Sequence, residues 1–168
     1  MRRRQETTEM LKESMGDALL SLMKEKPLEK ITIEEMTAKA DVGRVTYFRY
    51  FKSKDEVLAY KFRKSWERYT TENGKVDLRE RSFAAREYFA FSLSMRDTID
   101  LVYERGHQEA FLRAVLEVIR SYYVVSDTAA EYARSYYAYG LFGLFNTWVR
   151  HGYQETPEEM ANIFMGIK

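Results

Sequence analysis

The sequence lacks cysteine and has only 2 prolines, 8 glycines and 2 histidines among its 168 residues. Without cysteine there is no disulfide framework, no thiolate zinc site and no thiol nucleophile. Two histidines, His107 and His151, leave little for metal binding or general-base catalysis. The sequence also has no Gly-rich phosphate loop, no Ser–His–Asp arrangement and no paired-histidine zinc motif. We therefore expect a protein that is not an enzyme and that binds no cofactor and no metal ion.

Long apolar runs are missing as well. The most apolar stretch, Tyr136 to Val149, has 14 residues and lies between Arg134 and Arg150, whereas a membrane-spanning helix needs roughly 20. The first residues, MRRR, resemble the start of a signal peptide, but the polar QETTEM follows in place of an apolar segment. We expect a soluble, cytoplasmic protein that makes no membrane contact.

Helix-forming residues and charges are abundant. Charged residues make up 32% of the chain, and with few breakers this composition predicts an all-α protein. The overall charge of +1 hides an asymmetry. Residues 1–70 hold 16 Lys and Arg against 12 Asp and Glu, a net charge of +4, and residues 71–168 hold 11 against 14, a net charge of −3. The first half is suited to bind a polyanion.

Apolar periodicity and breakers divide the chain into helices. An apolar stripe from Leu11 to Leu22 predicts a helix over residues 6–26, which Pro27 ends. The polar segment 70–81 is the predicted domain boundary, with an N-terminal domain over 1–70, including a linking helix over 54–70, and a C-terminal domain over 71–168. The other helices are predicted over 33–40, 44–50, 54–69, 82–94, 96–105, 108–123, 128–150 and 157–167.

Two of these helices are short and are joined by a three-residue turn. Thr32 followed by Glu35 forms a capping box that starts the first, and residues 41–43 end it. A short helix pair in the basic half of a chain suggests a helix-turn-helix, although such pairs also occur in ordinary helical bundles. In a helix-turn-helix the second helix places its first residues against base edges. Arg44 there can donate two hydrogen bonds to a guanine.

The same segment carries a family resemblance. The sequences ITIEEMTAKA, TYFRYF and KSKDEVL, with Val42 in the turn, resemble the DNA-binding domain of the TetR/AcrR family of bacterial transcriptional regulators. That family usually has Gly-Val-Ser in the turn, and this chain has Asp41, Val42 and Gly43. We expect Asp41 to adopt a positive φ, which Asp tolerates better than most residues. Gly43 caps the second helix without a side-chain acceptor.

The resemblance implies that the protein binds a double-stranded DNA operator. Tyr47 and Phe51 are expected in the core. Residues 2–4, three arginines, either enter a minor groove or form a solvated tail. Thr32 either contacts a phosphate or serves only as a helix cap. The predicted DNA contacts are Thr32, Arg44, Val45, Thr46, Phe48, Arg49, Tyr50 and Lys54.

The roles of the C-terminal half are predicted from the resemblance. Members of the family use this half to form a two-fold dimer and to enclose a small-molecule cavity. For a homodimer, the expected contacts are Leu141, Leu144, Phe145 and Trp148. For an apolar or aromatic effector, the expected lining residues are Tyr103, Phe111, Tyr136 and Phe142, with ordinary core packing as the alternative. His107 is expected to be a capping or surface residue.

Together these observations predict a homodimeric DNA-binding transcriptional regulator. Its expected action is that of a repressor, bound to a palindromic operator and released by a small-molecule effector. The alternative is a coactivator or adaptor on the same fold that acts through a partner protein. Arg44, Thr46, Arg49 and Lys54 favour the regulator, because an adaptor that had abandoned DNA would not need them.

Overall fold

A computed structural model describes residues 2–72, 80–123 and 125–166, without the side chains of 2–5 and 81–83. Over these residues the chain forms nine α-helices, one 3-10 helix and no strand, which confirms the all-α prediction. In chain order the elements are α1 (Arg2–Glu25), η1 (Leu28–Lys30), α2 (Ile33–Lys39), α3 (Arg44–Tyr50), α4 (Lys54–Glu72), α5 (Arg81–Ser94), α6 (Arg96–Glu104), α7 (Glu109–Tyr122), α8 (Thr128–Arg150) and α9 (Pro157–Gly166).

Local signals set most helix ends. Helices α3 and α8 have the predicted bounds, and the others differ from the prediction by one to four residues at an end. Thr32 and Thr156 each accept a hydrogen bond from the backbone N–H three residues on, and the glutamate at that position accepts one in return from the threonine N–H. Both are complete capping boxes. No sequence signal predicted η1, a single turn behind Pro27.

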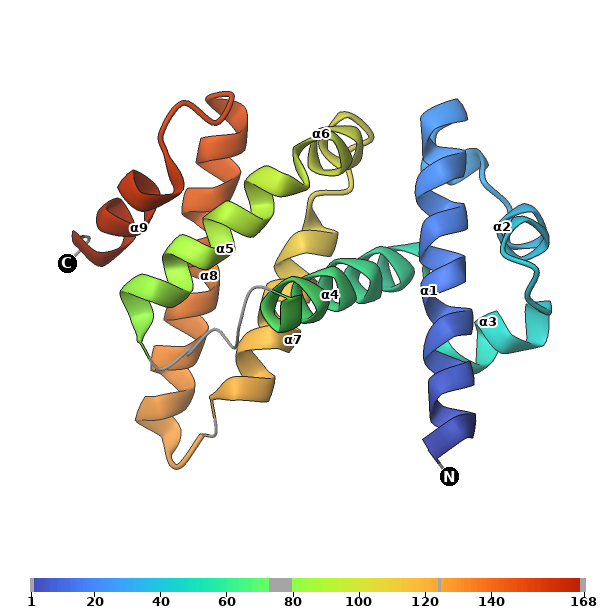
Figure 1. Cartoon of the computed structure of the whole chain (residues 1–168), viewed down its shortest axis with the longest axis horizontal. Helices are drawn as coiled ribbons and strands as arrows, with labels where there is room; N and C mark the ends of the chain where they lie inside the picture. The colour runs from blue at the N-terminus through green and yellow to red at the C-terminus, as the bar shows by residue number, and fades with distance from the viewer. Residues whose placement is uncertain (1, 73–79, 124, 167–168) are drawn as a thin grey trace.

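The helices form two groups that share α4. Figure 1 shows α1, α2 and α3 at one end of the molecule and α5, α8 and α9 at the other, with α4 running between them. Helix α4 packs on α1 in the first group and on α7 in the second, and α5 packs along α9. Any displacement of α4 therefore acts on both groups.

The crossing of α1 and α4 is unusually close. A Cβ at Gly16 would lie 2.9 Å from the Cβ of Lys61. The Lys61 ammonium pairs with Asp17 at 2.7 Å while its stem is buried against α1. Met15 and Leu19 beside it have no exposed surface. Glycine is therefore needed at position 16 to let the two backbones approach.

A chain of aromatic rings joins α4 to the second group of helices. The Phe62 ring on α4 lies 3.9 Å from that of Phe111 on α7, and Phe111 lies 5.6 Å from Phe145 on α8. These residues belong to the same buried cluster as Met15 and Leu19 of α1. Packed rings of this kind transmit displacement because a dense core has little room to absorb it.

None of the described helices is both long and apolar enough to cross a membrane.

Candidate nucleic-acid interface

Helices α2 and α3 are joined by the expected tight turn. Asp41 has φ 54°, as predicted for this position. The Val42 N–H donates to the Thr37 carbonyl at 2.9 Å, and the Val42 side chain is buried. Gly43 caps α3 with no side-chain hydrogen bond. The turn thus fixes α3 against α2 through backbone bonds and one apolar anchor.

Helix α3 divides its residues cleanly between core and surface. Tyr47 and the following Phe51 are buried, as predicted, with ring centroids 6.2 Å apart. On the other side Val45 is 71% exposed and Phe48 is 62% exposed, and Arg44 and Arg49 are exposed beside them. Exposed apolar groups flanked by arginines form a surface that suits base methyls and phosphates.

Arg44 is engaged in the free protein. Its Nη1 lies 2.5 Å from Glu34 Oε1 of α2, and both side chains are 56% exposed. An exposed pair of this kind contributes little to stability. It holds the guanidinium over the α2–α3 face, where it remains accessible to a competing acceptor.

Tyr50 and Thr32 lie at the borders of the exposed face. A hydrogen bond with Thr8 lowers the pKa of Tyr50, and the Lys12 ammonium lies 5.2 Å from the Tyr50 ring. Thr32 serves as the cap of α2 and its Oγ1 is 3.1 Å from Glu35 Oε2. Thr46 and Tyr50 are half-buried.

Lys54 has a structural role that no sequence signal predicted. Its ammonium donates to the Leu28 carbonyl and, at 2.8 Å, to the Ile31 carbonyl. These bonds tie the first residue of α4 to η1 and to the start of α2. Two of its three N–H donors are used in this way. The phosphate contact expected for Lys54 stays a prediction.

The two groups of helices also meet through polar contacts. His107, in the α6–α7 turn, lies with Nδ1 3.0 Å from Asp55 Oδ1 of α4 and Nε2 3.1 Å from Glu29 Oε1 of η1. Arg113 of α7 pairs with Glu56 of α4 at 3.2 Å. His107 was expected at a cap or on the surface, and no local signal pointed to partners 52 and 78 residues away. His107 thus connects the C-terminal helices to the base of the helix-turn-helix.

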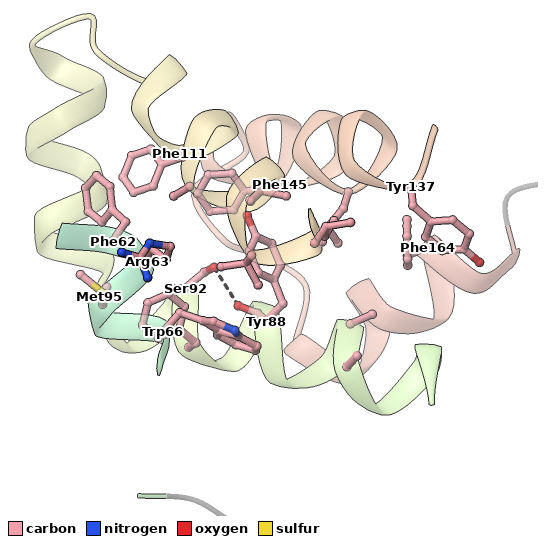
Figure 2. A pocket seen from close by; sticks show the side chains of 18 of the residues that line it. Phe62, Arg63, Trp66, Tyr88, Ser92, Met95, Phe111, Tyr137, Phe145 and Phe164 are labelled. Carbon is pink, nitrogen blue, oxygen red and sulfur yellow. Dashed lines mark hydrogen bonds between the residues drawn. The ribbon is translucent and has the colours of Figure 1, made fainter. Parts of the chain in front are cut away.

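An apolar cavity lies between α4 and the C-terminal helices, with a volume of about 100 Å³. Figure 2 shows Phe62, Arg63 and Met95 near one end and Tyr137 and Phe164 near the other. Helix α4 contributes Phe62, Arg63 and Trp66, which the sequence analysis had assigned to no cavity. The apolar spacing of Phe62 and Trp66 is visible in the sequence, but it does not reveal which helices cover that face. Further lining residues include Tyr88, Phe91, Ser92, Phe111, Val115, Leu141 and Phe145.

Of the four residues predicted to line a cavity, only Phe111 lines this one. Tyr103 lies behind the lining, with its ring 5.9 Å from that of Phe111 and 6.1 Å from that of Phe145. Phe142 packs against the core without reaching the cavity. Tyr136 is 64% exposed on the outside of α8, so its assignment is corrected. The rotation of α8 turns Tyr137 inward instead.

Of the four predicted dimer contacts on α8, two are buried and two are half-buried. Phe145 and Trp148 are each 1% exposed, so they pack inside the protomer and cannot form its outer face, which corrects that prediction. Leu141 and Leu144 are half-buried against the core. The exposed residues of α8 that follow one another at helical spacing are Tyr132, Tyr136, Tyr139 and Gly143.

Two other expectations concern the N-terminal arginines and metal binding. The side chains of residues 2–4 lie outside the described part of the chain. The described residues include no cluster of three His, Asp or Glu able to hold a metal ion.

Two short helices, a tight turn, and an exposed α3 face with arginines define a helix-turn-helix protein, the class in which α3 is the recognition helix. Comparison with known families narrows this class. A model described as bacterial regulatory proteins, tetR family, matches residues 17–60, and one described as transcriptional regulator C-terminal region matches residues 84–167, half of the chain. The chain belongs to the TetR family and is a DNA-binding transcriptional regulator. Neither the curated proteins nor the solved structures compared with it give a match.

Proposed function

We propose that this regulator is a homodimeric repressor that binds a palindromic operator through α3 and is released by a small apolar molecule. The exposed face of α3 carries the proposal, because Val45 and Phe48 are apolar and solvent-exposed beside Arg44 and Arg49. The net charge of +4 over residues 1–70 supports it. We divide the chain at residue 70 into a DNA-binding domain with α4 as the linking helix and a C-terminal domain for dimerisation and ligand binding.

The contacts follow from the chemistry of each side chain. Arg44 reads a base edge, and Val45, Thr46 and Phe48 offer carbon to thymine methyls. Arg49 and Tyr50 at the far end of α3, with Thr32 and Lys54 at the flanks, donate to phosphates and set the register. Arg44 exchanges Glu34 for a base acceptor on binding.

A dimer through α8 places two copies of α3 on one operator. Tyr132, Tyr136 and Tyr139 are 75%, 64% and 56% exposed on one face of α8. Large aromatic groups gathered on one exposed face are typical of an interface. Gly143 continues the stripe, and a Cβ there would meet nothing within 4 Å, so a second helix can approach. Two half-sites about one DNA turn apart follow from such a dimer.

Ligand binding in the cavity causes release of the protein from its operator. Phe62, Arg63 and Trp66 belong to α4, whose first residue Lys54 is bonded to η1. A ligand that prefers a displaced α4 shifts the separation of the two α3 helices away from the operator spacing.

Selection of the purified protein against a random DNA pool tests the operator. We expect an enriched palindrome whose affinity falls steeply as salt rises. Arg44→Ala should weaken binding to that site by roughly 1–3 kcal/mol and change binding to random DNA little. Arg120→Ala, an exposed arginine on α7, is the matched control. No enrichment would refute the repressor and favour the adaptor.

Sedimentation velocity tests the dimer. Tyr136→Glu should shift the protein to monomer, because a carboxylate in an apolar interface is left unpaired. Tyr122→Glu, at an aromatic residue 50% exposed on α7, is the control and should leave the dimer intact. An unchanged dimer in Tyr136→Glu would place the interface elsewhere.

A further inference from the structure

Two neighbouring glutamates at the start of α2 differ in what they contact. Glu35 completes the capping box with Thr32 and also pairs with Lys26. Glu34 takes no part in the cap. In the part of the chain that the structure describes, its side chain pairs with Arg44 alone, with Oε1 2.5 Å from Nη1. An acidic group at a helix start and an exposed ion pair each add little stability, so the fold gives the Glu34 carboxylate only a minor role.

Glu34 lies on the surface that we propose to face DNA. Its side chain and that of Arg44 are both 56% exposed, and Arg44 is followed on α3 by the exposed side chains of Val45 and Phe48. Because the two charged groups touch, a base edge that the guanidinium reaches is also within reach of the carboxylate. When Arg44 moves to a base, Glu34 loses its partner close to the phosphates, and an unpaired carboxylate in that setting is costly.

The chemistry of the DNA groove limits what can satisfy this carboxylate. A carboxylate only accepts hydrogen bonds, and the donors on base edges in the major groove are the amino groups of cytosine and adenine. Arginine pairs with O6 and N7 of guanine. In a G·C pair the cytosine amino group lies directly beside guanine O6, and its second N–H points into the groove. One G·C pair therefore offers an acceptor and a donor side by side, which matches the adjacent guanidinium and carboxylate.

We infer that Glu34 is a specificity-determining residue, which accepts a hydrogen bond from the cytosine of the G·C pair whose guanine Arg44 reads. This inference rests on the proposed function, in which α3 binds the operator and Arg44 leaves Glu34 for a base. A thymine in place of that cytosine presents O4, an acceptor, to the carboxylate. Glu34 thereby rejects A·T at this position, in addition to what Arg44 gains from guanine.

Operator binding by wild type, Glu34→Gln and Arg44→Ala tests the inference. The base pair in question is the one whose preference is lost when the selection is repeated with Arg44→Ala. Affinities are then measured for operators that carry G·C or A·T at that position. Wild type should prefer G·C. Glu34→Gln should lose about tenfold of this preference, the change that corresponds to one hydrogen bond, because an amide donates as well as accepts.

Glu25→Gln is the matched control. Glu25 is another exposed glutamate that pairs with a side chain of α2, Lys39, at 3.7 Å, and it lies at the end of α1. Its substitution removes the same charge from the N-terminal half of the chain. Glu25→Gln should keep the full preference for G·C, so a general gain in affinity from lost negative charge is told apart from a change in base preference.

A second measurement separates a direct contact from an effect on Arg44. 7-Deazaguanine in place of the guanine removes the N7 acceptor and keeps the cytosine partner. Wild type and Glu34→Gln should both bind this operator more weakly than the one with guanine, and Arg44→Ala should not distinguish the two. Sensitivity that persists in Glu34→Gln shows that Arg44 still reads the guanine.

The outcomes separate this inference from the function on which it rests. If Glu34→Gln keeps the full preference for G·C, the cytosine contact is overturned and the repressor stands. If Glu34→Gln also loses its sensitivity to 7-deazaguanine, Glu34 acts by orienting Arg44 and the cytosine contact is overturned. If an operator is selected but Arg44→Ala changes no position, base reading by Arg44 fails together with this inference. If no operator is enriched, the proposed function itself is refuted.

Discussion

Acid should weaken the joint between α1 and α4 through one carboxylate, Glu9. Its Oε2 accepts from the Tyr60 hydroxyl at 2.7 Å and lies 2.8 Å from Lys64 Nζ, and Lys12 is 3.6 Å from Oε1. Burial opposes the charged form, but the bonds from Lys64 and Tyr60 outweigh it and lower the pKa of Glu9 from 4.5 to about 2. The perturbation that tests this joint is Glu9→Gln, which removes the charge and keeps the shape.

The magnitude follows from the shift in the Glu9 pKa. One pKa unit corresponds to 1.36 kcal/mol, so the fall from 4.5 to about 2 amounts to roughly 3 kcal/mol if fully expressed. The Glu9 side chain is 32% exposed, and solvent screening reduces this to about 1–2 kcal/mol. Because the folded-state pKa is depressed, this stabilisation is fully present above pH 4.5. It is lost as pH falls toward 2.

Urea unfolding of wild type and Glu9→Gln at pH 7, 5, 4 and 3 measures this contribution directly. The variant should be less stable by about 1–2 kcal/mol at pH 7, and the difference should shrink as the pH falls below 4.5. Glu72→Gln, at an exposed residue near the end of α4, is the control and should change little at any pH. A difference between wild type and Glu9→Gln that does not depend on pH would refute the reasoning.

Three further predictions concern backbone and domain contacts. Gly16→Ala should lower the free energy of unfolding by about 1–2 kcal/mol despite the better helix propensity of alanine, because its Cβ would lie 2.9 Å from that of Lys61; thermal melting that shows stabilisation would contradict the close crossing. Asp41→Gly should stabilise the protein by up to about 1 kcal/mol, because Asp41 has φ 54° and glycine adopts that region without strain; a loss in urea unfolding would contradict this. His107→Ala should cost about 1 kcal/mol by urea unfolding, because it leaves Asp55 and Glu29 without a common partner; unchanged stability would show that this bridge does not hold the two groups of helices together.

The helices of this protein could be predicted from the sequence because their signals are local. An apolar stripe, a capping threonine with a glutamate three residues on, and a proline or glycine at the end all act within one or two turns. The predicted bounds of α3 and α8 agree with the structure at both ends. The positive φ of Asp41 could be predicted as well, because the family resemblance places Asp41 where a glycine usually stands, and Asp tolerates that conformation better than most residues.

The environment of each functional side chain was decided by the tertiary structure. Periodicity marks the apolar face of α8. Only the rotation of α8 against α5 and α7 decides that Phe145 and Trp148 are buried and that Tyr136 lies outside. Lys54 and His107 each find one partner in η1, a turn that no sequence signal predicted. The cavity likewise exists only because helices α4 to α9 close around it. The helices themselves follow from neighbours along the chain, whereas the cavity and the bridges follow from residues that meet only when the helices pack.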